Sequence, residues 1–399
     1  MISRIKALKR FFFVITAFIF LIISQLTGAA NVQSLAQKIS TEPTLRDKIG
    51  QMLVLGFNGN QLTPNSEIYR WIKQDGIGGV ILFDSDIPDK HFKRNIVSKS
   101  QVIRLNHDLQ RYNHQMNIRQ HRPDQPLIIT TDYEGGLVDR LKNAEGYEPS
   151  LTPASFSKLS SQKLSHEIKR RVDELKTSGF NLNLAPLVDV AVNPKNPVIA
   201  SQQRSFSPDP QIVARFASLM IQALRKQHIQ CTLKHFPGHG SSIQDSHYAP
   251  VDVTRTFQSY ELMPYQKLIL DSPHCGVIMV GHIINRQLDP SGLPATLSPT
   301  IITSLLRNHL HFKGVVISDD LEMKAITQQF GLEQAVTQAI NAGVDVLLFA
   351  NQQRLSTIEP KKIIDLIEQK VKTGEIKLDR INQAYQRIVE LKKTLKSQF

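Results

Sequence analysis

An aspartate and a histidine two residues apart in the middle of the chain have the side chains needed for proton transfer. The run KHFPGHG at residues 234–240 is followed by Asp245, Ser246 and His247. A carboxylate that binds one ring nitrogen of a histidine fixes its tautomer and raises the basicity of the other nitrogen. The Asp245/His247 pair is therefore predicted to protonate a leaving group and later to deprotonate water.

The same stretch of sequence supports a second chemistry. Lys234 and His235 can donate hydrogen bonds to sugar hydroxyls, and we interpret His239 as a structural loop residue. However, His235, His239, Asp245 and His247 also have the ligand types of a zinc site. The H-E-x-x-H helix pattern is absent, so we expect no metal and no cofactor. Metal-dependent hydrolysis is kept as an alternative.

Two adjacent carboxylates follow the apolar run 314–318. Successive strand residues face opposite ways, so at most one of the two should point into the mouth of a barrel. A carboxylate there can attack an anomeric carbon or stabilise an oxocarbenium ion. We assign this role to Asp319 and interpret Asp320 as the cap of the following helix.

A third group of polar residues is centred on Asp132 and Glu134, with Arg140 a few residues further on. Two carboxylates beside the flexible glycine pair 135–136 are suited to hold sugar hydroxyls or a metal. Arg204 lies in a long connection later in the chain, and taken alone it reads as a surface arginine.

The elements that must position these residues alternate regularly. Short apolar runs end in polar residues and are followed by helical stretches, which is typical of parallel strands in βα units. Eight such units predict a closed (β/α)8 TIM-type barrel, whose active site would form at the C-terminal ends of the strands. A doubly wound sheet is the second interpretation, but no GxGxxG follows the first run. The expected strands are Gln51–Phe57, Gly79–Phe83, Leu127–Asp132, Asn181–Asp189, Thr232–His235, Gly276–His282, Gly314–Asp319 and Val344–Ala350.

The spacing of apolar residues also predicts several helices between these strands. Gly179 and Gly343 provide C-cap signals for two of them. Residues from about 356 to 396 are expected to form two amphipathic helices that close the barrel. The other expected helices are Val102–Met116, His166–Ser178, Pro210–Gln227 and Leu332–Ala342.

The composition allows a large core and limits the partners. The chain has 399 residues, 41% of them hydrophobic, and a net charge of +13. No arginine-rich block and no aromatic-basic interleaving occur, so we expect no nucleic acid partner. A basic surface would also suit contact with an anionic cell envelope.

The N-terminus has the order of a secretory signal peptide. Basic residues within the first ten positions precede an apolar run from Phe11 to Ile23, and small residues follow at 28–30. The run is short for a stable membrane span. We therefore assign residues 1–30 to a signal peptide and 31–399 to the catalytic barrel. An uncleaved leader would anchor the protein to the membrane.

The two cysteines, Cys231 and Cys275, lie at the starts of expected buried strands. We interpret them as small core residues in preference to a disulfide.

Taken in chain order, these motifs resemble glycoside hydrolase family 3, and specifically its bacterial β-N-acetylglucosaminidase branch. The matching motifs extend from about residue 50 to residue 350. The KHFPGHG run with its downstream Asp-Ser-His is very specific to that branch.

The resemblance implies retaining, two-step hydrolysis of terminal non-reducing β-N-acetylglucosamine residues. By motif match, Asp319 corresponds to the nucleophile, His247 to the acid/base and Asp245 to its partner. The positions that the resemblance assigns to substrate binding are Asp132, Arg140, Arg204, Lys234 and His235.

The usual substrates of such enzymes are peptidoglycan fragments in cell-wall recycling. The common Gram-negative pattern is cytoplasmic and lacks a leader, whereas the leader here predicts a periplasmic or secreted protein, which we expect to be a monomer. A non-catalytic glycan-binding envelope protein is a further alternative, and a histidine acid/base would also tolerate phosphate as the acceptor.

Overall fold

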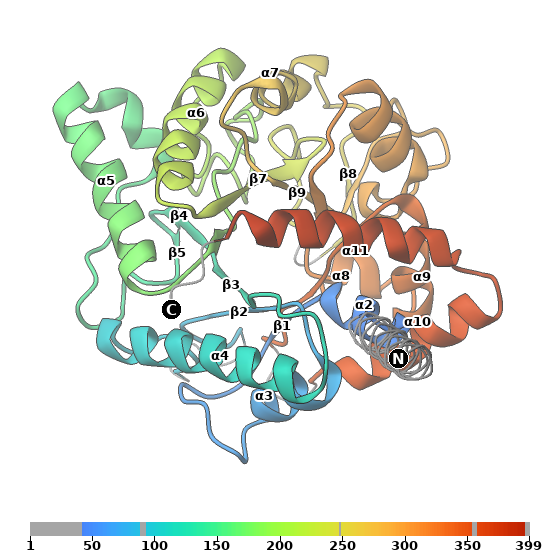
Figure 1. Ribbon diagram of the computed structural model, residues 1–399. Coiled ribbons are helices and arrows are strands. Elements are labelled where there is room, and N and C mark those ends of the chain that lie inside the picture. Colours follow the sequence, from blue (N-terminus) through green and yellow to red (C-terminus); the bar gives the residue numbers. More distant parts are fainter. Residues whose placement is uncertain (1–41, 88–92, 247–248, 353–356, 396–399) are drawn as a thin grey trace, which may run out of the picture.

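The computed structural model describes residues 42–87, 93–246, 249–352 and 357–395, and its centre is an eight-stranded parallel sheet surrounded by helices (Figure 1). Each of the eight apolar runs expected from the sequence overlaps one of these strands. The strands are short and almost entirely buried, because each is covered on both faces. They are β1 (Leu53–Gly56), β2 (Gly79–Ile81), β3 (Ile128–Thr131), β6 (Leu182–Asn183), β7 (Gln230–Phe236), β9 (Val277–Val280), β11 (Val315–Ser318) and β12 (Leu347–Phe349).

The sheet curls into a nearly closed barrel. Its strand order is β11-β9-β7-β6-β3-β2-β1-β12, and all neighbouring strands pair in parallel. The two ends of this order meet where Ile317 of β11 forms a parallel bridge with Val346, just before β12. The arrangement is that of a TIM-type barrel, in agreement with the sequence prediction.

Helices connect consecutive strands and turn their apolar faces to the barrel. In α6 (Pro210–Lys226), Asp209 caps the first turn by accepting from the Gln211 N–H, and Pro210 occupies the first helical position. The other connecting helices are α3 (Glu67–Arg70) with the π-helix η1 (Trp71–Asp75), α4 (Lys99–Arg119), α5 (Ser161–Thr177), α7 (Met263–Leu270), the π-helix η5 (Thr300–His309), α8 (Lys324–Thr327) and α9 (Leu332–Ala342).

The last helix lies across the N-terminal end of the barrel. The chain enters through α2 (Leu45–Gln51) and ends with α10 (Pro360–Lys372) and α11 (Leu378–Lys393), which runs in front of the strands in Figure 1. The buried Lys392 of α11 donates hydrogen bonds to Gln51 Oε1 (2.7 Å) and to Gly78 O (2.8 Å), which directly precede β1 and β2. The C-terminal part of α11 thus contacts the segments that lead into β1 and β2.

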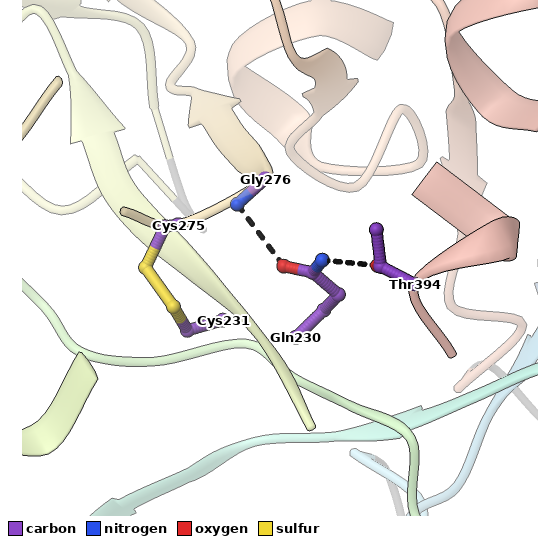
Figure 2. The surroundings of a disulfide bond; sticks show 5 residues. All are labelled: Gln230, Cys231, Cys275, Gly276 and Thr394. Carbon is purple, nitrogen blue, oxygen red and sulfur yellow. Dashed lines mark hydrogen bonds between the residues drawn. A yellow bond between two sulfur atoms is a disulfide. The ribbon is translucent and has the colours of Figure 1, made fainter. Parts of the chain in front are cut away.

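A disulfide bond joins Cys231 to Cys275, so the interpretation of the two cysteines as unbridged core residues was wrong. Figure 2 shows the bond beside Gln230, whose side chain binds the Gly276 N–H and the Thr394 hydroxyl. β7 pairs directly with β9 in the sheet, and this pairing brings the two cysteines together. The sequence shows only that each cysteine starts a strand, and it does not show which strands are neighbours.

The expected signal peptide, residues 1–30, lies outside the described residues. A membrane-spanning helix, which needs both length and an apolar sequence, does not occur in the described part of the chain.

Removal of the disulfide should destabilise the protein without changing its fold. We expect the double variant C231S/C275S to lose about 2–4 kcal/mol of unfolding free energy, because the bond restricts a chain loop with a sequence separation of 44 residues. Urea unfolding of both proteins measures the difference. The control is the wild type unfolded with a thiol reductant, which should match the variant, and equal midpoints for oxidised wild type and variant would contradict the expectation.

Candidate active site

Polar side chains from six strands gather at the C-terminal end of the barrel. Asp132 directly follows β3, Asp319 directly follows β11, and Lys234 and His235 lie near the C-terminal end of β7. Because the strands are parallel, these ends share one rim. Other polar residues of the rim are Asp84 after β2, Asp189 after β6 and His282 after β9.

A buried chain of ion pairs organises one side of the rim. The guanidinium of Arg204 donates to both oxygens of Glu134, at 2.8 and 2.7 Å. Lys234 Nζ lies 2.7 Å from Glu134 Oε1 and 2.7 Å from Asp132 Oδ1. Arg204 is only 5% exposed, so its interpretation as a surface arginine was wrong. The arginine is drawn inside because Glu134 is buried and needs a cationic partner.

Glu134, Lys234 and Arg204 are ionised in the folded protein. Burial would raise the pKa of Glu134, but the charges of Arg204 and Lys234 outweigh burial and hold that pKa well below its usual range. Burial likewise opposes the charge of Lys234, and the carboxylates of Asp132 and Glu134 nevertheless raise its pKa. A permanently charged and buried network of this kind holds fixed donors and acceptors for a polar ligand.

Arg140 continues this chain at its more exposed end. Its guanidinium lies 3.8 Å from Asp132 Oδ2 and 3.8 Å from Asp84 Oδ1, and 5.4 Å from the centre of the Phe83 ring. The side chain is 30% exposed, in contrast to Arg204 and Lys234. The structure thus brings together four of the five residues expected to bind substrate, and adds Glu134 as the residue that joins them.

Asp189 holds the fifth, His235. The Asp189 carboxylate is fully buried and accepts from His235 Nδ1 (2.7 Å) and from the backbone N–H groups of His235 and His239. Burial would raise the pKa of Asp189, but these histidines and hydrogen bonds lower it. A Nδ1–H group that donates to Asp189 leaves Nε2 as the second functional nitrogen of His235. The sequence places Asp189 at the end of an expected strand, but it does not show that Asp189 pairs with His235.

His239 supports the loop that follows β7. Its ring nitrogens bind Ser242 Oγ (2.9 Å) and Ser246 Oγ (3.1 Å), and burial lowers its pKa to about 4. A neutral histidine with both ring nitrogens hydrogen-bonded agrees with the interpretation of His239 as a structural loop residue. Asp245 is half-buried in this loop, and its carbonyl accepts the Ala249 N–H (3.2 Å). His247, the expected acid/base, lies outside the described residues.

The adjacent carboxylates Asp319 and Asp320 differ in their surroundings. The backbone N–H of Asp319 donates to Val280 O of β9 (3.0 Å), which fixes it at the rim. Asp320 Oδ1 instead accepts from the N–H groups of Glu322 (3.2 Å) and Ala350 (3.0 Å). Asp320 does not cap α8, which begins at Lys324 with Met323 at its N-cap, so that expectation was wrong.

Burial and the neighbouring charge of Glu322 raise the pKa of Asp320 to about 8. Asp320 therefore holds its proton to a higher pH than an ordinary aspartate does, which favours a negative charge on Asp319 over one on Asp320.

Sequence reasoning missed a buried acid beneath the loop that carries Asp245. Glu261 accepts from the backbone N–H groups of Ser241 (3.2 Å) and Gln258 (3.0 Å) and is only 1% exposed. Burial raises its pKa to about 7. Glu261 lies in the short helix η3 (Ser259–Leu262), far from any strand end, so the strand-end pattern gives no signal for it.

No three His, Cys, Asp or Glu side chains are grouped as a metal site requires, within the ranges of the chain that the structure describes. In barrels of this kind, the C-terminal ends of the strands are where active sites form. A family model described as the glycosyl hydrolase family 3 N terminal domain matches residues 44–391. The chain belongs to glycosyl hydrolase family 3, which confirms the resemblance seen in the motifs.

Relatives with names and structures agree with this assignment. The chain is 31% identical to "Beta-hexosaminidase A" of Pseudoalteromonas piscicida, over 88% of this chain and 61% of that protein. It is 32% identical to the "Beta-hexosaminidase" of Stenotrophomonas maltophilia strain K279a, over 76% and 84% of the two chains. A family 3 β-N-acetylglucosaminidase from Paenibacillus superposes with a TM-score of 0.77 at 31% identity, over 88% of this chain and 63% of that one. The chain thus spans about three-fifths of the first and third of these relatives.

Glu261 should make stability depend on pH. Its folded-state pKa of about 7 lies above the ordinary value of 4.5, so the folded state holds the proton more tightly than the unfolded state does. Protonated Glu261 therefore adds up to about 3 kcal/mol to the unfolding free energy. This stabilisation is fully present below about pH 4.5 and is lost as the pH rises through 7. Urea unfolding at a series of pH values measures the loss.

The matched control is E261Q, which cannot ionise. Between pH 4.5 and 7, the wild type should lose unfolding free energy relative to E261Q. Parallel curves for the two proteins would show that Glu261 ionises normally.

Proposed function

We propose that this protein hydrolyses terminal non-reducing β-N-acetylglucosamine residues from glycosides, with retention of configuration. The observation that carries the proposal is the buried network of Asp132, Lys234, Glu134 and Arg204, on the same rim as Asp319. Such a network offers fixed charged partners to a ring of hydroxyls. The family and the names of the relatives support N-acetylglucosamine as the sugar.

The barrel geometry supports a division of labour across the rim. In a ring of eight strands in the order observed, β3 lies four places from β11 and hence opposite it. A sugar bound between them has its hydroxyl groups near Asp132 and its anomeric carbon near Asp319. In the first step, a carboxylate oxygen of Asp319 attacks the anomeric carbon while the bond to the leaving oxygen breaks.

Proton transfer is assigned to the loop after β7. His247, oriented by Asp245, gives its proton to the leaving oxygen and so neutralises the departing alkoxide. In the second step, His247 takes a proton from water, which attacks the anomeric carbon and releases Asp319. The short separation of Asp245 and His247 in the sequence supports their pairing.

We also propose an exported protein that acts on peptidoglycan fragments. The Cys231–Cys275 disulfide supports export, because such bonds persist in oxidising compartments and are rare in the cytosol. The signal-like first thirty residues point the same way. Purified muropeptides, assayed beside a chromogenic β-N-acetylglucosaminide, test the reaction and the substrate together. If N-acetylglucosamine is released from neither substrate, the proposed reaction is rejected. If it is released only from the chromogenic substrate, the proposed peptidoglycan substrate is rejected.

Replacement of the nucleophile should abolish turnover and spare the fold. We expect D319N to lower kcat/KM on a chromogenic β-N-acetylglucosaminide by on the order of 10³-fold or more, because no covalent intermediate can form. The adjacent D320N is the matched control, and it should lose far less because an amide oxygen can still accept the backbone hydrogen bonds that Asp320 Oδ1 accepts. Thermal unfolding verifies that both variants are folded, and near-normal activity of D319N would refute its role.

Replacement of the acid/base should depend on the leaving group. We expect H247A to lose about 10²- to 10⁴-fold on a poor alkyl leaving group and much less on an activated aryl one, which departs without a proton. Steady-state rates on a series of aglycones give the dependence. Equal losses along the series would count against proton transfer by His247.

A further inference from the structure

Asp84 is a rim carboxylate to which neither the motifs nor the family resemblance assigns a role. It directly follows the run that contains β2, in the same way that Asp132 directly follows β3. Its Oδ1 lies 3.8 Å from Arg140, which itself lies 3.8 Å from Asp132. Asp84 is therefore the outermost member of the ion-pair chain that runs inward to Glu134 and Arg204.

This outer end is polar and incompletely bonded. Asp84 Oδ1 and Arg140 Nε are both buried, and neither has a hydrogen-bond partner among the residues that the structure describes. The inner members contrast with them, since Lys234 and Arg204 both bond Glu134 at 2.7–2.8 Å. Buried polar atoms without hydrogen-bond partners lower the stability of a folded protein. Here they lie beside residues expected to bind substrate.

The backbone that carries Asp84 is held firmly in place. Asp84 O accepts the Arg94 N–H (3.1 Å), and the fully buried Arg94 pairs with Asp86 Oδ1 (2.7 Å). The same guanidinium donates to Phe57 O (2.7 Å) and Asn351 O (2.5 Å), at the ends of the strand runs that contain β1 and β12. Asp84 is thus preorganised, as a ligand-binding carboxylate needs to be.

The position of β2 indicates which part of a sugar Asp84 meets. β2 and β3 are neighbours, and β3 lies opposite β11 in the ring. A sugar with its anomeric carbon at Asp319 directs its far end, which carries the C4 and C6 hydroxyls, toward Asp84 and Arg140.

We propose that Asp84 is a further substrate-binding residue, which accepts a hydrogen bond from the C4 or C6 hydroxyl of the terminal sugar. The inference rests on the proposed function and adds a specificity determinant to it. With Asp84 included, the chain holds three carboxylates and three cations, so it is electrically balanced. A neutral hydroxyl keeps this balance, whereas a carboxylate or phosphate on the sugar would face the negative charge of Asp84.

The test compares 4-nitrophenyl N-acetyl-β-glucosaminide with its 4-deoxy and 6-deoxy analogues. In the wild type, loss of the hydroxyl that binds Asp84 should lower kcat/KM by about 10- to 100-fold, because a charged acceptor is left without its partner. In D84A, loss of the same hydroxyl should change kcat/KM by less than about threefold, and D84N should fall between the two proteins. D379A, which removes a carboxylate at the opposite end of the barrel, should keep the wild-type pattern.

Each result bears on a different claim. The comparison is a ratio within one protein, so partial loss of folded D84A or D84N does not affect it. If D84A and D84N keep the wild-type penalties, or if the wild type shows none, Asp84 does not bind the sugar. If the wild type turns over the parent substrate, the proposed function stands whatever the outcome for Asp84. If it does not, the proposed function fails and the inference fails with it.

Discussion

The architecture of the rim depends on one buried carboxylate, Glu134, and on the two cations that neutralise it. Removing an ion from water costs several kcal/mol even after relaxation, and an unpaired buried charge destabilises a protein by about 3–5 kcal/mol. Glu134 follows β3, Lys234 is part of β7, and Arg204 lies in the connection after β6. The barrel must bring all three segments together before any of these charges is tolerated. The same condition then fixes Asp132, which shares Lys234 with Glu134.

The two ends of the barrel meet different physical demands. At the N-terminal end, α11, Lys392 and the Cys231–Cys275 disulfide hold strand starts together, and the polar groups there bond one another. At the C-terminal end, polar groups are retained whose bonding is incomplete, as at Arg140 and Asp84. The C-terminal end thus keeps polar atoms with spare bonding capacity beside the residues expected to bind substrate.

Much of the fold follows from patterns that are local in sequence. Seven of the eight strands lie within the expected apolar runs, and β7 extends beyond its run at both ends. The helix α9 has the bounds that its spacing and Gly343 predict. The wrong predictions concern contacts between residues that are distant in the sequence. Arg204 looks like a surface arginine because its partner lies 70 residues away, and Cys231 and Cys275 become neighbours only when β7 pairs with β9. Asp320 was misassigned because its hydrogen bonds go to Ala350 at the end of another strand run.

The site was predictable to the extent that a strand end marks it. That rule found Asp132, Lys234, His235 and Asp319, and applied to the second strand it also points to Asp84. It gave no signal for Glu261, because Glu261 supports the site through the backbone of a loop.

The two sides of the proposed reaction are supported by different kinds of contact. On the sugar side, charged side chains at strand ends are locked by ion pairs. On the leaving-group side, the loop after β7 is held at its base by amides: Asn196 Nδ2 donates to His239 O (2.7 Å) and Gly240 O (3.1 Å). Gly240 is required there, because a Cβ atom would lie 1.6 Å from Val190 O. The base of the loop is thus held by hydrogen bonds and close backbone packing, and Asp245 lies further along the loop. The segment proposed to carry the acid/base is therefore separate from the strand ends proposed to select the sugar, so a substitution in one need not disturb the other.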